Sequence, residues 1–97
     1  MLVMSDIEAK VFRYEMMLRT ALGCTEIVED KKYSKDFMTM ARSYYEDGMY
    51  FQKGGDLVNA LICFSYGHGW LDAGIRVGVL KSNGQARKRL YINRDSL

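Results

Sequence analysis

The sequence contains no proline, and this absence favours long, uninterrupted helices, because proline lacks a backbone N–H and breaks the helix in which it lies. Sandwiches and barrels need many short strands and turns, so an all-α chain is the default expectation. A membrane span is not expected either, because the longest apolar stretch is interrupted by Asn59, His68, Asp72 and Arg76.

Cysteine and histidine are scarce, and this excludes several kinds of site. Cys24 and Cys63 lie far apart without a CxxC pair, and His68 is the one histidine in the chain. A disulfide framework or a zinc site is therefore not expected, and neither a metal nor a cofactor is predicted. The two thiols are typical of a reduced, cytoplasmic protein. The N-terminus lacks the pattern of a signal peptide, so we expect no export.

The length and charge of the chain fit one small domain with a basic end. Its 97 residues are 48% hydrophobic, which is typical of an ordered globular protein. Net charge is +2, but residues 81–97 carry five basic side chains and one acidic one. We predict a helical domain over residues 1–80 and a basic, partly ordered tail over 81–97. The tail could contact nucleic acid through Arg87, Lys88, Arg89 and Arg94, although a solvated terminus is the plainer interpretation.

The domain is expected to be organised around a long apolar helix that follows the turn at Gly54-Gly55. Asp56 is a suitable N-cap, and the helix should run from Leu57 to about Leu80, a length of roughly 36 Å. One row of apolar residues recurs at three- and four-residue steps, which predicts a buried face. Its members are Leu57, Leu61, Phe64, Leu71, Ile75 and Val79.

A second apolar row lies roughly opposite the first and is a candidate binding surface. Its members are Ile62, Tyr66, Trp70, Ala73 and Val77. A helix that is apolar nearly all round is normally buried nearly all round, so either the rest of the chain or another molecule should cover this row. Phe12 and Met16 are candidates from within the chain.

Four glycines, Gly67, Gly69, Gly74 and Gly78, are expected inside this helix, where each opposes helix formation by about 0.5–1 kcal/mol relative to alanine. Close approach of a neighbouring helix at Gly67, Gly74 and Gly78 would offset that loss. A groove in which a ligand or partner peptide meets the bare backbone is the alternative.

Two further helices are predicted, over residues 6–22 and 35–53. The first should begin with a capping box formed by Ser5 and Glu8, and Ser34 could cap the second. The connection between them, residues 24–34, is expected to contain at most a helical turn. Because the turn at residues 54–55 is short, the second and third helices should be antiparallel neighbours. The predicted fold is an antiparallel up-and-down three-helix bundle with a short basic C-terminal tail.

Three elements of the sequence carry a family resemblance: YYEDGMYF, the turn at Gly55-Asp56 followed by Ala60, and YGHGWLDAGIRVG from Tyr66 to Gly78. With them, the segment 41–80 resembles the archaeal family catalogued as domain of unknown function 357. The resemblance implies a small up-and-down helical bundle in an archaeal cytosolic protein. It implies no established activity.

The candidates for a catalytic or ligand-binding site are polar side chains along one side of the central helix. His68, Asp72 and Arg76 follow one another at four-residue steps, and with Tyr45 they form a candidate polar site. A helix-edge histidine beside an Asp72–Arg76 ion pair is the plainer interpretation. We therefore expect a non-catalytic interaction module whose second apolar row meets another protein, most simply a second copy in a homodimer. The alternatives are nucleic-acid binding through the tail and a small enzyme or ligand-binding domain around His68 and Asp72.

Overall fold

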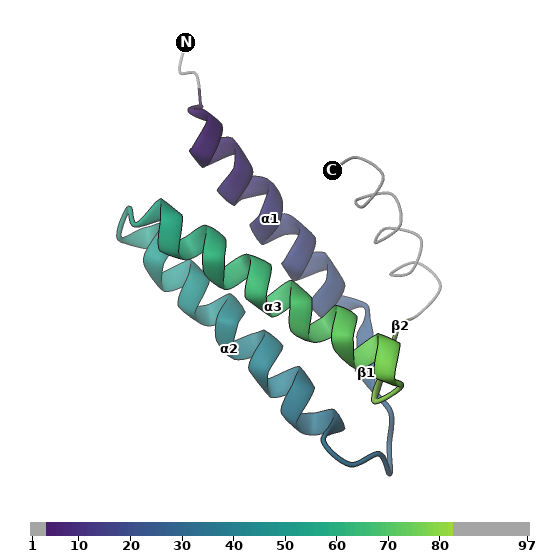
Figure 1. Ribbon diagram of the computed structural model, residues 1–97. Coiled ribbons are helices and arrows are strands. Elements are labelled where there is room, and N and C mark those ends of the chain that lie inside the picture. The colour runs from purple at the N-terminus through teal and green to yellow at the C-terminus, as the bar shows by residue number, and fades with distance from the viewer. Residues whose placement is uncertain (1–3, 83–97) are drawn as a thin grey trace.

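The structure is a computed structural model that describes residues 4–82, and these residues form three helices and two short strands (Figure 1). In chain order the elements are α1 (Asp6–Gly23), β1 (Thr25–Ile27), α2 (Ser34–Lys53), α3 (Leu57–Val77) and β2 (Leu80–Ser82). The three predicted helices are present, and most of the described residues are helical.

The N-terminus of α1 carries the predicted capping box. The Ser5 hydroxyl accepts a hydrogen bond from the Glu8 backbone N–H at 3.2 Å, and the Ser5 backbone N–H donates to the Glu8 carboxylate at 3.0 Å. These two bonds satisfy backbone donors that the first helical turn leaves unpaired. The bond from the Ser5 backbone also lowers the pKa of Glu8, since it favours the charged carboxylate.

The start of α2 differs from the expectation that Ser34 caps it. Ser34 is the first residue of the helix, and its hydroxyl donates to the Lys31 carbonyl at 2.8 Å, within the preceding turn. The residue before the helix is Tyr33, which has a left-handed backbone (φ 71°) and makes no side-chain capping bond. The chain therefore enters α2 through a tight turn, and a side-chain cap is not used.

At its start, α3 follows the prediction, but it ends sooner. The Asp56 carboxylate accepts from the Asn59 backbone N–H at 3.2 Å, as expected of an N-cap. The helix ends at Val77, three residues before the predicted end at Leu80, because Gly78 adopts a left-handed conformation (φ 86°). Gly78 is thus a helix terminator, which corrects its placement inside the helix.

A two-stranded antiparallel sheet was missing from the all-α prediction. β1 pairs with β2 in a register that sets Thr25 opposite Ser82 and Ile27 opposite Leu80. The connection after α1, which was expected to contain at most a helical turn, therefore contains a strand. Because β1 follows α1 and β2 follows α3, the sheet fastens the C-terminal ends of these two helices together. We call this strand pair the clip.

The central position belongs to α3, which lies between α1 and α2 (Figure 1). It packs most extensively against α2 and next against α1, while α1 and α2 have little direct contact. The Cα atoms span 50 × 26 × 16 Å, so the molecule is elongated. The buried core is the following set: Val11, Leu18, Ala21, Met38, Ala41, Ala60, Phe64, Leu71 and Leu80.

Two glycines on α3 permit close packing, each against a different neighbour. A Cβ at Gly67 would lie 2.8 Å from the Leu18 side chain and 3.1 Å from the Ala41 backbone oxygen, so the expected close approach of helices is confirmed there. A Cβ at Gly74 would collide with Leu80, so this glycine accommodates the clip. Gly69 faces open space.

Candidate functional site

The second apolar row of α3 lies on the face that α1 and α2 leave open. Ile62, Tyr66 and Val77 are 48%, 60% and 65% exposed, Ala73 is exposed, and Trp70 is half-buried. We call these five residues the outer row. Phe12 and Met16 were expected to cover it, but they are themselves 50% and 42% exposed. Neither residue lines the groove that runs along this face.

A shallow apolar groove of about 630 Å³ runs along this face. It is lined by three small residues of α3 at four-residue steps and by three aromatic rings. The lining residues are Ser65, Gly69, Ala73, Phe37, Tyr66 and Trp70. Because side chains four residues apart lie above one another on a helix, the small residues form a continuous line that an incoming side chain could approach closely.

The aromatic rings beside the groove are held by partners on α2. The Trp70 ring meets the Phe37 ring edge to face, with centroids 5.2 Å apart and an interplanar angle of 80°. The Tyr66 ring stacks on the Tyr44 ring, with centroids 5.3 Å apart and an angle of 24°. Such contacts restrict the rotamers of Tyr66 and Trp70, so an incoming surface would meet rings that are already ordered.

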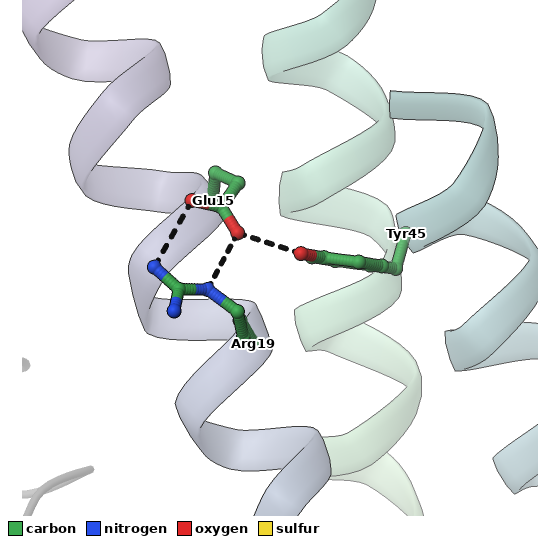
Figure 2. Close-up of polar contacts among 3 residues, drawn as sticks. All are labelled: Glu15, Arg19 and Tyr45. Atoms are coloured by element: carbon green, nitrogen blue, oxygen red, sulfur yellow. Dashed lines mark hydrogen bonds and ion pairs between the residues drawn. The ribbon is translucent and has the colours of Figure 1, made fainter. Parts of the chain in front are cut away.

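A polar cluster links α1 to α2 on another side of the molecule (Figure 2). The Tyr45 hydroxyl donates a 2.7 Å hydrogen bond to the Glu15 carboxylate, and the Arg19 Nε donates to the same oxygen at 2.9 Å. Glu15 is 8% exposed, whereas the Arg19 side chain is 60% exposed. A buried carboxylate needs such donors, and Tyr45 supplies one from the facing helix.

The cluster perturbs the proton affinity of its members. Burial, reinforced by the hydrogen bond and charge of Glu15, raises the pKa of Tyr45 to about 12. The same carboxylate raises the pKa of Arg19 through its hydrogen bond. Tyr45 is therefore protonated near neutral pH, where it acts as a hydrogen-bond donor and is unsuited to act as a base.

Glu15 is a residue that the sequence analysis missed, although a signal was present. It falls within the buried stripe of α1, between Val11 and Leu18, at a helical spacing of four and three residues. A charged residue in such a stripe indicates a buried carboxylate with a partner. Tyr45, predicted to belong with His68, Asp72 and Arg76, instead gives its hydroxyl to Glu15.

His68 and Asp72 lie near each other on one edge of α3. The His68 Nδ1 is 3.7 Å from an Asp72 carboxylate oxygen, and the His68 Nε2 is buried without a hydrogen-bond partner in the described structure. Arg76 is exposed one turn further on. Within residues 4–82 no group of three or more His, Cys, Asp or Glu side chains could hold a metal ion. An aspartate at this distance can orient the histidine ring. Catalysis by the pair would also need a nucleophile or a second base.

The buried thiol of Cys63 is a poor candidate for that nucleophile. Cys24 and Cys63 are both free, and Cys63 is buried in the core region. Burial raises the pKa of the Cys63 thiol, with smaller contributions from the charges of Asp47 and Asp56. A thiol with a raised pKa stays protonated at neutral pH and reacts slowly.

Two other expectations concern nucleic-acid binding by the tail and the absence of a membrane-spanning helix. The candidate nucleic-acid contacts, Arg87, Lys88, Arg89 and Arg94, lie outside the described residues, so nucleic-acid binding stays a prediction. None of the helices within residues 4–82 has both the length and the apolar character that crossing a membrane requires.

Comparison with known proteins relates the chain to one family. A family model described as "Protein of unknown function (DUF357)" matches residues 13–80. The crystal structure of protein AF1782 from Archaeoglobus fulgidus, which carries the same family description, superposes with a TM-score of 0.70 at 24% sequence identity. The superposition covers 80% of this chain and 95% of that chain, and at this identity it establishes a shared fold. No curated protein matches the chain.

Proposed function

The chain belongs to the DUF357 family, and from this premise we propose that it is a non-catalytic interaction module whose outer row on α3 binds another protein surface. The family assignment confirms the resemblance found in the sequence and extends it over most of α1. The proposal includes an antiparallel up-and-down bundle as the scaffold, which is supported by the short α2–α3 connection, and a basic tail. Two free, well-separated thiols support a cytoplasmic location.

One observation carries the proposal, namely the exposure of the outer row along a continuous apolar groove. Single exposed apolar residues are common on protein surfaces, whereas large contiguous apolar patches mark sites that contact a protein, a membrane or a ligand. Here Ile62, Tyr66 and Val77 are each about half exposed or more, and the half-buried Trp70 ring lies among them. Tyrosine and tryptophan are also the residues that most often dominate binding energy at interfaces.

The polar groups support a structural role. The Tyr45 hydroxyl and the Arg19 guanidinium both satisfy Glu15, and the Cys63 thiol is buried. His68 and Asp72 lie 3.7 Å apart, and a catalytic pair of this kind would also need a nucleophile or a second base. An interaction role needs no such group.

Site-specific photo-crosslinking tests the proposal directly. We would place p-benzoylphenylalanine at Tyr66 in the outer row and, as a matched control, at Tyr50, an exposed tyrosine of α2 that does not line the groove. The protein would be expressed in its source organism and irradiated in living cells. We expect the probe at position 66 to form covalent protein adducts and the probe at position 50 to form few.

Two results would contradict an interaction role for the outer row. The first is an absence of adducts at position 66, and the second is equal labelling at both positions, since it would indicate random collisions. Circular dichroism of both probe-bearing proteins controls for folding. Because the two tyrosines are 60% and 75% exposed, neither substitution should disturb the core.

A further inference from the structure

The groove along the outer row lies near the point where the described chain ends. Its lining residues on α3 run from Ser65 to Ala73, toward the C-terminal end of the helix. After α3 the chain turns back, so that Leu80 packs against Gly74. The described residues end at Ser82. The segment that follows therefore starts beside the same turns of α3 that carry the groove.

The sequence after Ser82 contains an apolar cluster in a basic setting. Residues 83–97 lie outside the described residues, and they read NGQARKRLYINRDSL. Leu90, Tyr91 and Ile92 follow one another directly, with basic side chains on both sides. Burial of apolar side chains is favourable roughly in proportion to the area that is removed from water. The cluster therefore gains free energy from an apolar surface within its reach.

The groove is within that reach. Eight residue steps separate Ser82 from Leu90, and an extended chain of this length spans at most about 26 Å. Along the axis of α3, the distance from Gly74 to Gly69 in the groove is about 7.5 Å, and a helix with its side chains is about 10–12 Å across. Three extended residues cover about 10 Å, which is close to the length of roughly 12 Å over which α3 lines the groove.

Charge and covalent attachment both favour this contact. Residues 83–97 carry four basic side chains and one acidic one, whereas residues 1–82 carry ten basic and eleven acidic ones, so the two parts have opposite net charge. The lining of the groove has no charged side chain, so the cluster enters it without desolvating an ion. A short linker also holds the cluster at an effective concentration on the order of 1 mM, so even a weak contact is populated.

We propose that the apolar cluster of residues 90–92 covers the groove in the free protein and competes there with the partner surface. The inference rests on the proposed function and adds a regulator to the same site. Three residues cover much less than the roughly 800 Å² that a standard interface buries on each partner. A partner that contacts the whole outer row therefore displaces the cluster, and its apparent affinity is reduced by the fraction of chains in which the groove is covered.

Fluorescence of Trp70 tests the cover. Trp70 is the single tryptophan of the chain and lines the groove, so its emission reports how well the groove is shielded from water. In the full-length variant Leu90→Ser/Ile92→Ser, the emission maximum should shift to longer wavelength, and acrylamide should quench the emission more strongly than in the wild type. Leu97→Ser removes an apolar side chain outside the cluster and is the matched control, which should leave both quantities unchanged. Circular dichroism checks the helices in each protein.

Two results of this experiment would overturn the proposal. Equal quenching in the wild type and the double variant would mean that the cluster does not shield Trp70. A wild type whose quenching increases on dilution would mean that the cover comes from another copy of the chain, since a contact within one chain does not depend on concentration.

The photo-crosslinking probe at Tyr66 tests the contact directly in the purified, dilute protein. Irradiation should link the probe to residues 90–92 in a product that has the mass of one chain. Trypsin releases the cluster as the peptide LYINR, and mass spectrometry of the digest identifies the link. The probe at Tyr50, which does not line the groove, should form no such link.

The two crosslinking experiments separate this inference from the function on which it rests. Protein adducts in cells without a link to the cluster in the purified protein overturn the cover and leave the interaction role standing. A link to the cluster without adducts in cells overturns the interaction role. If both hold, Leu90→Ser/Ile92→Ser should raise the yield of adducts at position 66 in cells, because the partner no longer competes with the cluster. A lower yield would mean that the cluster assists the partner, and it would overturn the competition.

Discussion

At the scale of single residues, the bond from Tyr45 to Glu15 is the polar contact with the clearest energetic consequence. Removing the hydroxyl in Tyr45→Phe leaves a buried carboxylate with one donor fewer, which typically costs about 1–3 kcal/mol of stability. We expect the free energy of unfolding in urea to fall by about 1–2 kcal/mol, since Arg19 still pairs with Glu15. Tyr50→Phe, at a 75% exposed position, is the control and should have little effect.

The same hydroxyl gives the protein a predictable response to alkaline pH. Its pKa rises from 10.0 to about 12 on folding, so the folded state holds the proton more tightly than the unfolded state. The stabilisation is therefore fully present below pH 10 and is lost as the pH rises toward 12. The stability difference between wild type and Tyr45→Phe should shrink over this range. A difference that stays constant up to pH 12 would show that Tyr45 does not titrate as the bond to Glu15 requires.

The structural roles of individual residues were only partly predictable from the sequence. The capping residues Ser5, Glu8 and Asp56 act at short sequence range, and their roles follow from the local pattern. Tyr45 was singled out, but its partner was not, because Glu15 lies 30 positions away and the pairing depends on how α1 lies against α2. The outer row was identified because helical periodicity alone places its members on one face.

At the scale of the element, two glycines of α3 should respond oppositely to one substitution. In Gly69→Ala the new methyl group enters open space, so the single chain should gain about 0.5–1 kcal/mol in helix stability. In Gly67→Ala it lies 3.1 Å from the Ala41 backbone oxygen, which cannot move without displacing α2. Overpacking of this kind costs about 1–3 kcal/mol.

Thermal unfolding of the two variants at low protein concentration, where association does not contribute, measures the difference. The melting temperature should rise for Gly69→Ala and fall for Gly67→Ala. Equal shifts for both variants would mean that α2 and α3 are not in close contact at Gly67. The two substitutions lie two residues apart on the same helix, so each serves as the control for the other.

The elements themselves were predictable to different degrees. Each helix extends over many residues and carries a repeating apolar pattern, so three were found with ends correct to within a few residues. The clip consists of two three-residue strands, which are too short to show an alternating pattern, and their pairing joins segments that are distant in sequence. Gly78 was placed inside α3 because composition does not reveal that its backbone is left-handed.

At the scale of the whole molecule, the contacts of α1 with the rest of the chain are uneven along its length. Its C-terminal end is fastened to α3 by the clip, whereas residues 4–10 are exposed except for the half-buried Ile7. Local opening requires little energy where few apolar contacts must break. Backbone amides in the first two turns of α1 should therefore exchange with deuterium much faster than those near Leu18, which is fully buried.

Hydrogen exchange followed by mass spectrometry or NMR measures this gradient. The amides of α3 around Phe64 provide the slow reference, because that side chain is also fully buried. Uniform protection along α1 would indicate that its N-terminal half is held by contacts that the structure does not contain. The capping box at Ser5 should slow fraying of the first turn, but the amides of this turn should still exchange faster than those near Leu18.

The clip also has a consequence for the order in which the protein is made. Helix α1 is the first to leave the ribosome, but the strand that fastens it ends at Ser82 and is synthesised after all three helices. Helices α2 and α3 are adjacent in sequence and can pair as soon as α3 emerges, because such local contacts close short loops. Of the three helices, the one that is translated first is thus the last to be secured, and a chain released before residue 80 would have α2 and α3 paired but no clip to fasten α1.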